Sequence, residues 1–123
     1  MKIVNYEELE NIISDYASSN EITKPLMVFG SHYQDARIQI VKKIFGNANF
    51  WKITFKDDNP RPDIPYCLYD GYLGDDGSNV ILNNCIEIAA KIKRPVFCFF
   101  DYSTKEKVPA EILSELEALE YTE

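Results

Sequence analysis

The chain has 123 residues, of which 46% are hydrophobic and 27% are charged, and its formal net charge is −7. We expect residues 1–123 to form a single domain, because this length suits one core and the apolar content is too high for a disordered chain. No apolar run approaches the ~18 residues that cross a bilayer, so we expect no membrane-spanning segment.

The first predicted helix covers residues 6–18. Asn5 and Glu8 have the spacing of a capping box, and apolar residues recur behind them at helical intervals. A polar turn leads to residues 25–30, a short apolar run that starts with a proline and ends with Gly30. Such a run is typical of a buried strand.

A second helix is predicted directly after this strand. Ser31 and Gln34 offer another capping box, an apolar stripe follows, and Gly46 provides a C-terminal stop. Residues 50–56 then alternate between apolar and polar side chains. This alternation indicates a half-exposed strand near an edge of the sheet.

Residues 57–77 are predicted to form a long loop rich in proline, glycine and aspartate. Only residues 64–69 within it could form a short strand or turn of their own. Loops of this length are uncommon inside compact domains and are usually functional. A third helix is expected from Ser78 to the stop at Pro95.

The last two predicted elements are a strand and a helix. Residues 95–101 contain five consecutive apolar residues and end in Asp101, the pattern of a strand buried on both faces of a parallel sheet. A final helix is predicted over residues 109–121, with Pro109 in its first turn and leucines aligned along one face.

Alternation of strands and helices places the chain in the α/β class. We expect a mainly parallel sheet of three to five strands covered by helices, with right-handed crossovers. The three cysteines, Cys67, Cys85 and Cys98, lie among apolar residues and lack C-x-x-C spacing. They are therefore expected to be reduced thiols of the core and not a metal or disulfide framework.

Small and polar residues follow each predicted strand, and in an open parallel sheet these strand ends border the site. The residues are Gly30, Ser31 and His32 after the first strand, Asp57 and Asp58 after the second, and Asp101 and Tyr102 after the third.

Two interpretations of these residues remain open. They can be helix caps and turn residues without chemistry. Alternatively, Asp57, Asp58 and Asp101 could hold Mg²⁺ for phosphoryl transfer, with His32 as a base. The plainer interpretation is favoured, because parallel topology gathers strand-end residues whether or not they react.

The order of the predicted elements, from Tyr6 to Tyr121, resembles the first half of an AAA+ P-loop ATPase core, closest to the McrB and MoxR-like branches. Gly71-Tyr72 and Asp76-Gly77 match steps of the family's loop. Residues 94–103, Arg-Pro-Val-Phe-Cys-Phe-Phe-Asp-Tyr-Ser, look like a Walker B strand, and residues 112–120 look like the helix behind it. The resemblance implies a three-layer P-loop core.

The nucleotide-binding motifs depart from this pattern. A Walker A loop, G-x-x-x-x-G-K-[ST], uses backbone amides and Lys for the phosphates and a hydroxyl for Mg²⁺. Counting from Gly30, its last three positions are Asp35, Ala36 and Arg37. The acidic pair of a Walker B strand is replaced by Asp101-Tyr102. The resemblance therefore implies a core that has kept the fold and lost the ATPase residues.

We therefore expect a non-catalytic interaction or regulatory module, without a cofactor, that binds a protein partner. The resemblance suggests that this partner is an AAA+ subunit or a second copy. The alternatives are a Mg²⁺-dependent phosphoryl-transfer or receiver-like module and a nucleotide binder that does not hydrolyse.

Charge supports the choice of a protein partner. Residues 1–19 and 101–123 contribute −3 and −5, whereas residues 20–100 contribute +1. The overall acidity makes nucleic acid an unlikely ligand, and the acidic start lacks a secretory signal, so we expect a cytoplasmic protein. Four glutamates are predicted to form an exposed face of the final helix. These are Glu111, Glu115, Glu117 and Glu120. This face can meet a basic partner, or it can be a solvated surface that only keeps a small protein soluble.

The bases lie near the middle of the chain. Lys42 and Lys43 fall in the second predicted helix, and Lys52 and Lys56 fall in the predicted edge strand. Because these lysines alternate with apolar residues, solvated helix and strand faces are favoured over a basic binding face.

Overall fold

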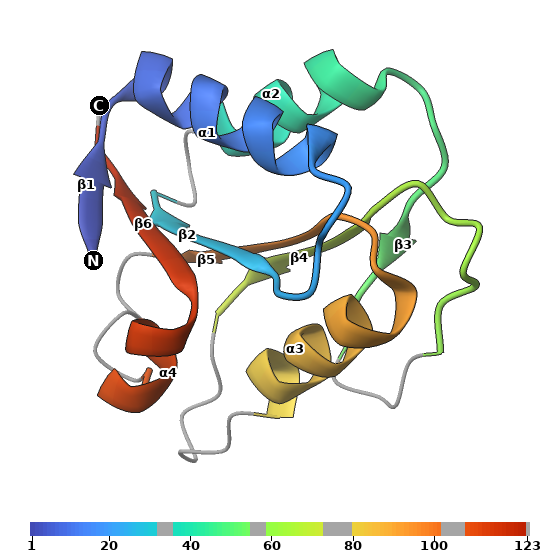
Figure 1. The fold of residues 1–123 in the computed structure, drawn as a ribbon. Coiled ribbons are helices and arrows are strands. Elements are labelled where there is room, and N and C mark those ends of the chain that lie inside the picture. The colour runs from blue at the N-terminus through green and yellow to red at the C-terminus, as the bar shows by residue number, and fades with distance from the viewer. Residues whose placement is uncertain (32–35, 55–58, 73–79, 102–107, 123) are drawn as a thin grey trace.

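Six parallel strands form one sheet with helices on both faces, in a computed structural model that describes residues 1–31, 36–54, 59–72, 80–101 and 108–122 (Figure 1). The strands occur in the order β1-β6-β2-β5-β4-β3. Their bounds are β1 Lys2–Val4, β2 Leu26–Gly30, β3 Trp51–Lys52, β4 Cys67–Gly71, β5 Val96–Asp101 and β6 Glu117–Tyr121.

The helices form the two outer layers. Helices α1 and α2 lie on one face of the sheet, and α3 and α4 lie on the other (Figure 1). Their bounds are α1 Tyr6–Ser18, α2 Ala36–Phe45, α3 Val80–Ile92 and α4 Ala110–Glu115. The predicted α/β class and helix-covered parallel sheet are confirmed, although the sheet has one strand more than the upper expectation of five.

Local signals placed several of these elements correctly. The capping box at the start of α1 is present, with the Glu8 N–H donating to Asn5 Oδ1 at 2.9 Å. Gly46 follows the last residue of α2 with φ of 61°, a left-handed conformation that glycine adopts without a steric penalty. The predicted edge strand is β3, but it is shorter than residues 50–56, with the structure describing strand only at Trp51–Lys52.

The core consists of two apolar clusters, one on each face of the sheet. Central strand β5 serves both, because Phe97 and Phe99 pack toward α1 and α2 while Cys98 and Phe100 pack toward α3. All of its residues from Val96 to Phe100 are fully buried. The uninterrupted apolar run is thus explained by burial on both faces.

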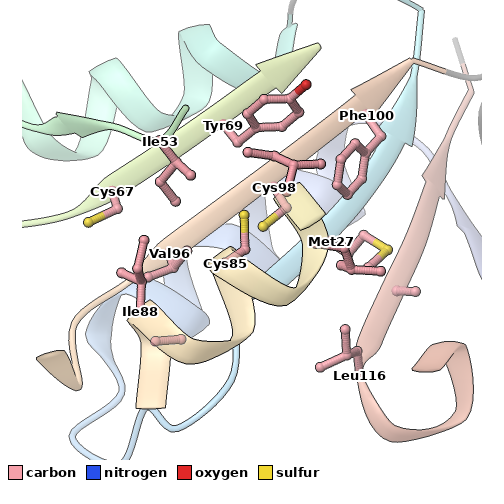
Figure 2. Close-up of a cluster of buried hydrophobic side chains, with 14 of the residues drawn as sticks. Met27, Ile53, Cys67, Tyr69, Cys85, Ile88, Val96, Cys98, Phe100 and Leu116 are labelled. Carbon is pink, nitrogen blue, oxygen red and sulfur yellow. The ribbon is translucent and has the colours of Figure 1, made fainter. Parts of the chain in front are cut away.

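The three cysteines behave as predicted. Cys67, Cys85 and Cys98 are buried and form no disulfide in the cluster between the sheet and α3 (Figure 2). Burial and the neighbouring Cys85 thiol raise the pKa of Cys98 well above its ordinary value. Thiolate is the reactive form of cysteine, so the raised pKa favours a structural role for Cys98.

The predicted final helix over residues 109–121 is wrong beyond Glu115. Helix α4 ends there, and β6 inserts between β1 and β2, pairing in parallel with both. Leu116 and Ala118 contact one core cluster, whereas Leu119 and Tyr121 contact the other. The apolar side chains of this segment therefore alternate between the two faces of the sheet, as in a strand. Pairing of its backbone with β1 and β2 outweighs the helical spacing of its leucines.

The long loop predicted over residues 57–77 contains strand β4. Residues Cys67–Gly71 pair with β5 on one side, and Cys67 and Leu68 lie opposite β3 on the other. The strand was underestimated because prolines and aspartates surround it, while its own first three residues are buried. The predicted long loop is therefore interrupted by β4, an internal strand of the sheet.

Candidate functional site

The carboxyl ends of β2, β5 and β4 lie side by side in the sheet. Gly30, the last residue of β2, is in register with Asp101 of β5, and Phe100 is in register with Gly71 of β4. Sequence reasoning placed Gly30 and Asp101 at neighbouring strand ends, and the structure brings them together. This edge is where open parallel sheets bind ligands.

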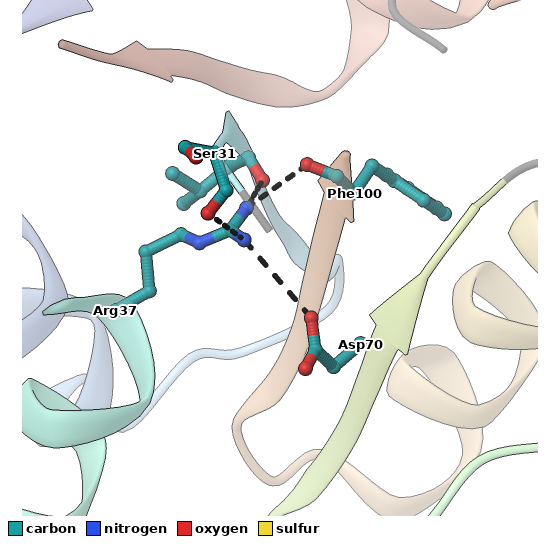
Figure 3. Close-up of polar contacts among 5 residues, drawn as sticks. Ser31, Arg37, Asp70 and Phe100 are labelled. Atoms are coloured by element: carbon teal, nitrogen blue, oxygen red, sulfur yellow. Dashed lines mark hydrogen bonds and ion pairs between the residues drawn. The ribbon is translucent and has the colours of Figure 1, made fainter. Parts of the chain in front are cut away.

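The side chain of Arg37 occupies this edge. Its Nη1 donates to the carbonyl oxygen of Val28 at 3.0 Å and to that of Phe100 at 2.9 Å (Figure 3). Its Nη2 donates to the Ser31 carbonyl oxygen at 3.5 Å. The guanidinium thus joins the ends of β2 and β5, two strands that are distant in sequence.

Arg37 is only 1% exposed, the largest fully buried side chain among the described residues. A guanidinium does not lose its proton in proteins, so this is a buried positive charge. Its Cζ lies 5.3 Å from the centre of the Phe99 ring, and its Nη2 lies 4.0 Å from Asp70 Oδ1. Carbonyl dipoles, an aromatic face and a carboxylate together compensate for the lost hydration.

Local sequence explains how Arg37 reaches this position. It is the second residue of α2, which begins at Ala36 and is the next helix after β2, whose last residue is Gly30. Cations are disfavoured at a helix N-terminus, so the strand-end carbonyls must outweigh the helix dipole. Gly30 lies directly beside the guanidinium, since a Cβ at this position would lie 3.4 Å from Arg37 Cζ and Nη1.

Asp70 is a site residue that sequence reasoning missed. It lies near the end of β4 with its side chain 24% exposed, and its carboxylate faces the Arg37 guanidinium (Figure 3). The Asp70-Gly71 pair had the appearance of a turn signal. Recognising Cys67–Tyr69 as a buried strand would have placed Asp70 among the strand-end residues.

Several predicted site residues lie outside the described part of the chain. Ser31 is exposed at the end of β2, and Ala36 is the half-buried first residue of α2. The predicted site residues that lie outside the described part of the chain are His32, Asp35, Asp57, Asp58 and Tyr102. The described residues contain no cluster of three or more His, Cys, Asp or Glu that could hold a metal ion.

The predicted acidic face of the final helix needs correction. Glu111 is exposed in α4, but Glu120 lies in β6 and is only 7% exposed. A buried strand residue cannot form an exposed helical face with Glu111. The side chains of Glu115 and Glu117 lie outside the structural description.

Comparisons with known proteins gave no relatives: no protein-family model, no curated protein and no solved structure matches the chain. In the part of the chain that the structure describes, no helix combines the length and the apolar composition needed to cross a bilayer.

Proposed function

We propose that the chain is a non-catalytic protein-interaction or regulatory module with a P-loop-like core that has lost its ATPase residues. In this proposal it binds or imitates a subunit of an AAA+ assembly. One observation carries the argument: the buried Arg37 guanidinium occupies the strand ends where a P-loop enzyme needs a metal ion and phosphates.

The chemistry of P-loop enzymes explains the weight of this observation. In these enzymes the Walker A hydroxyl and the Walker B aspartate hold Mg²⁺ together. The corresponding positions are Arg37 and Asp101, and Asp101 is in register with Gly30 on the neighbouring strand. A guanidinium fixed beside the Phe100 carbonyl would repel a divalent cation at this point. The arginine is therefore an internal replacement for the ion.

Anchoring of Arg37 also argues against a nucleotide-binding role for its charge. The Nη1 atom is engaged by two carbonyl oxygens and Asp70 faces Nη2, so an entering phosphate would have to displace neutral and negative partners. A mobile surface arginine would bind phosphate readily. The Arg37 guanidinium instead bonds to the ends of β2 and β5. This favours an interaction module over a nucleotide binder that does not hydrolyse.

Thermal unfolding with nucleotides tests the loss of the ATPase site. Millimolar Mg²⁺-ATP, Mg²⁺-ADP or Mg²⁺ alone should leave Tm unchanged, because only a ligand that binds the folded state raises it. A saturable rise with Mg²⁺-ATP would favour the nucleotide binder, and a rise with Mg²⁺ alone would favour the carboxylate metal site. Either result would contradict the proposal.

Affinity capture tests the interaction itself. The full chain should retain a specific protein from extracts of its native host, identified by mass spectrometry. Reversing the two glutamates Glu115 and Glu117 to Lys asks whether the acidic C-terminal segment carries the contact. Absence of any specific protein, with unchanged behaviour of the reversed variant, would count against an interaction function.

A further inference from the structure

A cavity of about 220 Å³ lies between α2 and the edge formed by β3 and β4. Ile38 and Val41 of α2 and Leu68 of β4 supply aliphatic surface inside it. Apolar cavities of about 150 Å³ accommodate a benzene molecule. This cavity is thus large enough for one aromatic or large aliphatic side chain of another molecule.

An aromatic stack forms one wall of the cavity. The Phe50 ring lies parallel to the Tyr66 ring, with centroids 5.1 Å apart and an angle of 12° between the planes. Tyr66 is buried, whereas Phe50 is 42% exposed. Large exposed aromatics beside a cavity are characteristic of interface anchors, because they gain most from losing contact with water.

Two lysines give the cavity its charge. Lys42 of α2 and Lys52 of β3 both line it, and both are exposed. Within the described residues neither lysine forms an ion pair, in contrast to Lys43, whose Nζ lies 3.0 Å from Glu10 Oε2. Asp70 also lines the cavity, but its carboxylate faces the Arg37 guanidinium. Among the described residues that line the cavity, the charge outside the Arg37–Asp70 pair is therefore positive, in a chain whose net charge is −7.

The same features continue along the surface. A second cavity of about 480 Å³, next to the turn after α2, shares Lys42, Phe50 and Tyr66 with the first. The two hollows flank one aromatic and basic surface, which suits an extended segment better than a compact small molecule. We name this surface, formed by Lys42, Phe50, Lys52, Tyr66 and Leu68, the β3–β4 groove.

We infer that the β3–β4 groove is the docking site for an acidic segment of a protein partner, anchored by one aromatic or large aliphatic side chain. The inference rests on the proposed function and names the surface that carries it. The anchor fills the cavity beside Phe50, and the flanking carboxylates face Lys42 and Lys52. Charge complementarity of this kind sets orientation and association rate, whereas the buried anchor supplies most of the affinity.

A peptide titration followed by NMR tests this inference on the full ¹⁵N-labelled chain. The probe is acetyl-Glu-Asp-Phe-Asp-Glu-amide, which combines the anchor with flanking carboxylates. We expect saturable shifts of the amides around Lys42, Phe50 and Leu68, with Kd of about 1 mM or tighter. The same peptide with Ala in place of Phe, and a Lys-Lys-Phe-Lys-Lys version, should bind at least tenfold more weakly.

Variants separate the groove from general charge effects. Lys42→Glu with Lys52→Glu should reduce affinity for the probe at least tenfold, whereas Lys91→Glu with Lys93→Glu, two exposed lysines at the end of α3, should not. Equal binding of all three peptides, or shifts outside the groove, would overturn the inference. Shifts of groove amides on raising protein concentration without peptide would assign the surface to a second copy and also overturn it.

Failure of the groove and failure of the proposed function are distinguishable. If the native chain and the Lys42→Glu, Lys52→Glu variant capture the same partner equally and the probe does not bind, the partner uses another surface. The groove inference then falls while the interaction function stands. If the native chain captures nothing specific, the interaction function itself falls.

Discussion

Arg37 is the residue on which the account depends. Its side chain joins the ends of β2 and β5, two strands that are distant in the sequence. In the proposed function it also stands where a P-loop enzyme would carry a hydroxyl. An internal cation that is tied to strand-end carbonyls needs no ligand to stabilise it. A buried charge held by hydrogen bonds through Nη1 and Nη2 is costly to disturb, because its partners would remain in the protein without it.

Substitution of Arg37 measures this contribution. Arg37→Ala should lower the free energy of unfolding by about 3 kcal/mol or more, because two carbonyls and Asp70 lose a charged donor. Arg37→Lys should lose less but remain destabilised, since an ammonium lacks the planar fork. Chemical denaturation gives both values.

The control for this experiment is Arg61→Ala. Arg61 is 71% exposed and pairs at 3.8 Å with Asp63, which is 77% exposed, so removal of Arg61 should cost less than about 0.5 kcal/mol. If Arg37→Ala unfolds as the control does, the guanidinium is not an integral part of the strand ends.

Only part of this site could be predicted from the sequence. Comparison with a Walker A motif singled out Arg37, because it stands where that motif has a hydroxyl. It could not show that the side chain fills the site, because its acceptor on Phe100 is 63 residues away and becomes a neighbour only in the folded sheet. Asp70 was missed for the same reason, as its strand was hidden between turn-forming residues.

At the scale of elements, hydrophobic periodicity predicted the secondary structure correctly where the pattern fitted one kind of element. It failed where the pattern fitted both a helix and a strand. The unbroken run of β5 and the capping box of α1 each had one structural explanation. Residues 116–121 fit both helical and alternating patterns. They form a strand in the fold because β6 pairs with β1 on one side and with β2 on the other. Strand pairing over long sequence distances carries no local signal that could have decided it.

Tyr16 shows how one helix is tied to the sheet. Its hydroxyl donates to the Lys24 carbonyl oxygen at 2.8 Å and accepts from the Val96 N–H at 3.0 Å. The hydroxyl thus links α1 to the first residue of β5. Burial raises the pKa of Tyr16 well above its ordinary value of 10.0.

This link predicts the behaviour of the chain at high pH. The unfolded chain loses the Tyr16 proton above pH 10 while the folded chain keeps it, so stability is complete below that pH and falls as pH rises. Tyr16→Phe should cost about 1–3 kcal/mol at pH 7 by orphaning the Val96 N–H. The same substitution should reduce the slope with which the free energy of unfolding falls above pH 10, by up to about 1.4 kcal/mol per pH unit.

Denaturation between pH 7 and 11 provides the comparison, with Tyr6→Phe at an exposed tyrosine as the matched control. A Tyr16→Phe variant with the same stability and the same alkaline slope as the native chain would show that the hydroxyl does not link α1 to β5.

At the scale of the whole molecule, the proposed function rests on the occupied strand ends and on the surface that the fold exposes. Open parallel sheets bind ligands at the carboxyl ends of their strands, but here the buried Arg37 side chain lies at that position. The β3–β4 groove presents aromatic and basic groups at one end of the sheet, although the chain is acidic overall. Net charge alone pointed to basic partners, whereas the folded surface points to an acidic segment.

The central claim of the proposal is that a protein side chain permanently occupies the strand ends where a P-loop enzyme would bind phosphate and metal. NMR of the Arg37 guanidinium tests it most directly. We predict separate, slowly exchanging Nη–H signals, because the group is 1% exposed and bonded to fixed carbonyls. Addition of millimolar Mg²⁺-ATP should leave these signals unchanged. Rapid exchange with solvent, or a saturable shift on adding Mg²⁺-ATP, would show that the site is open and contradict the account.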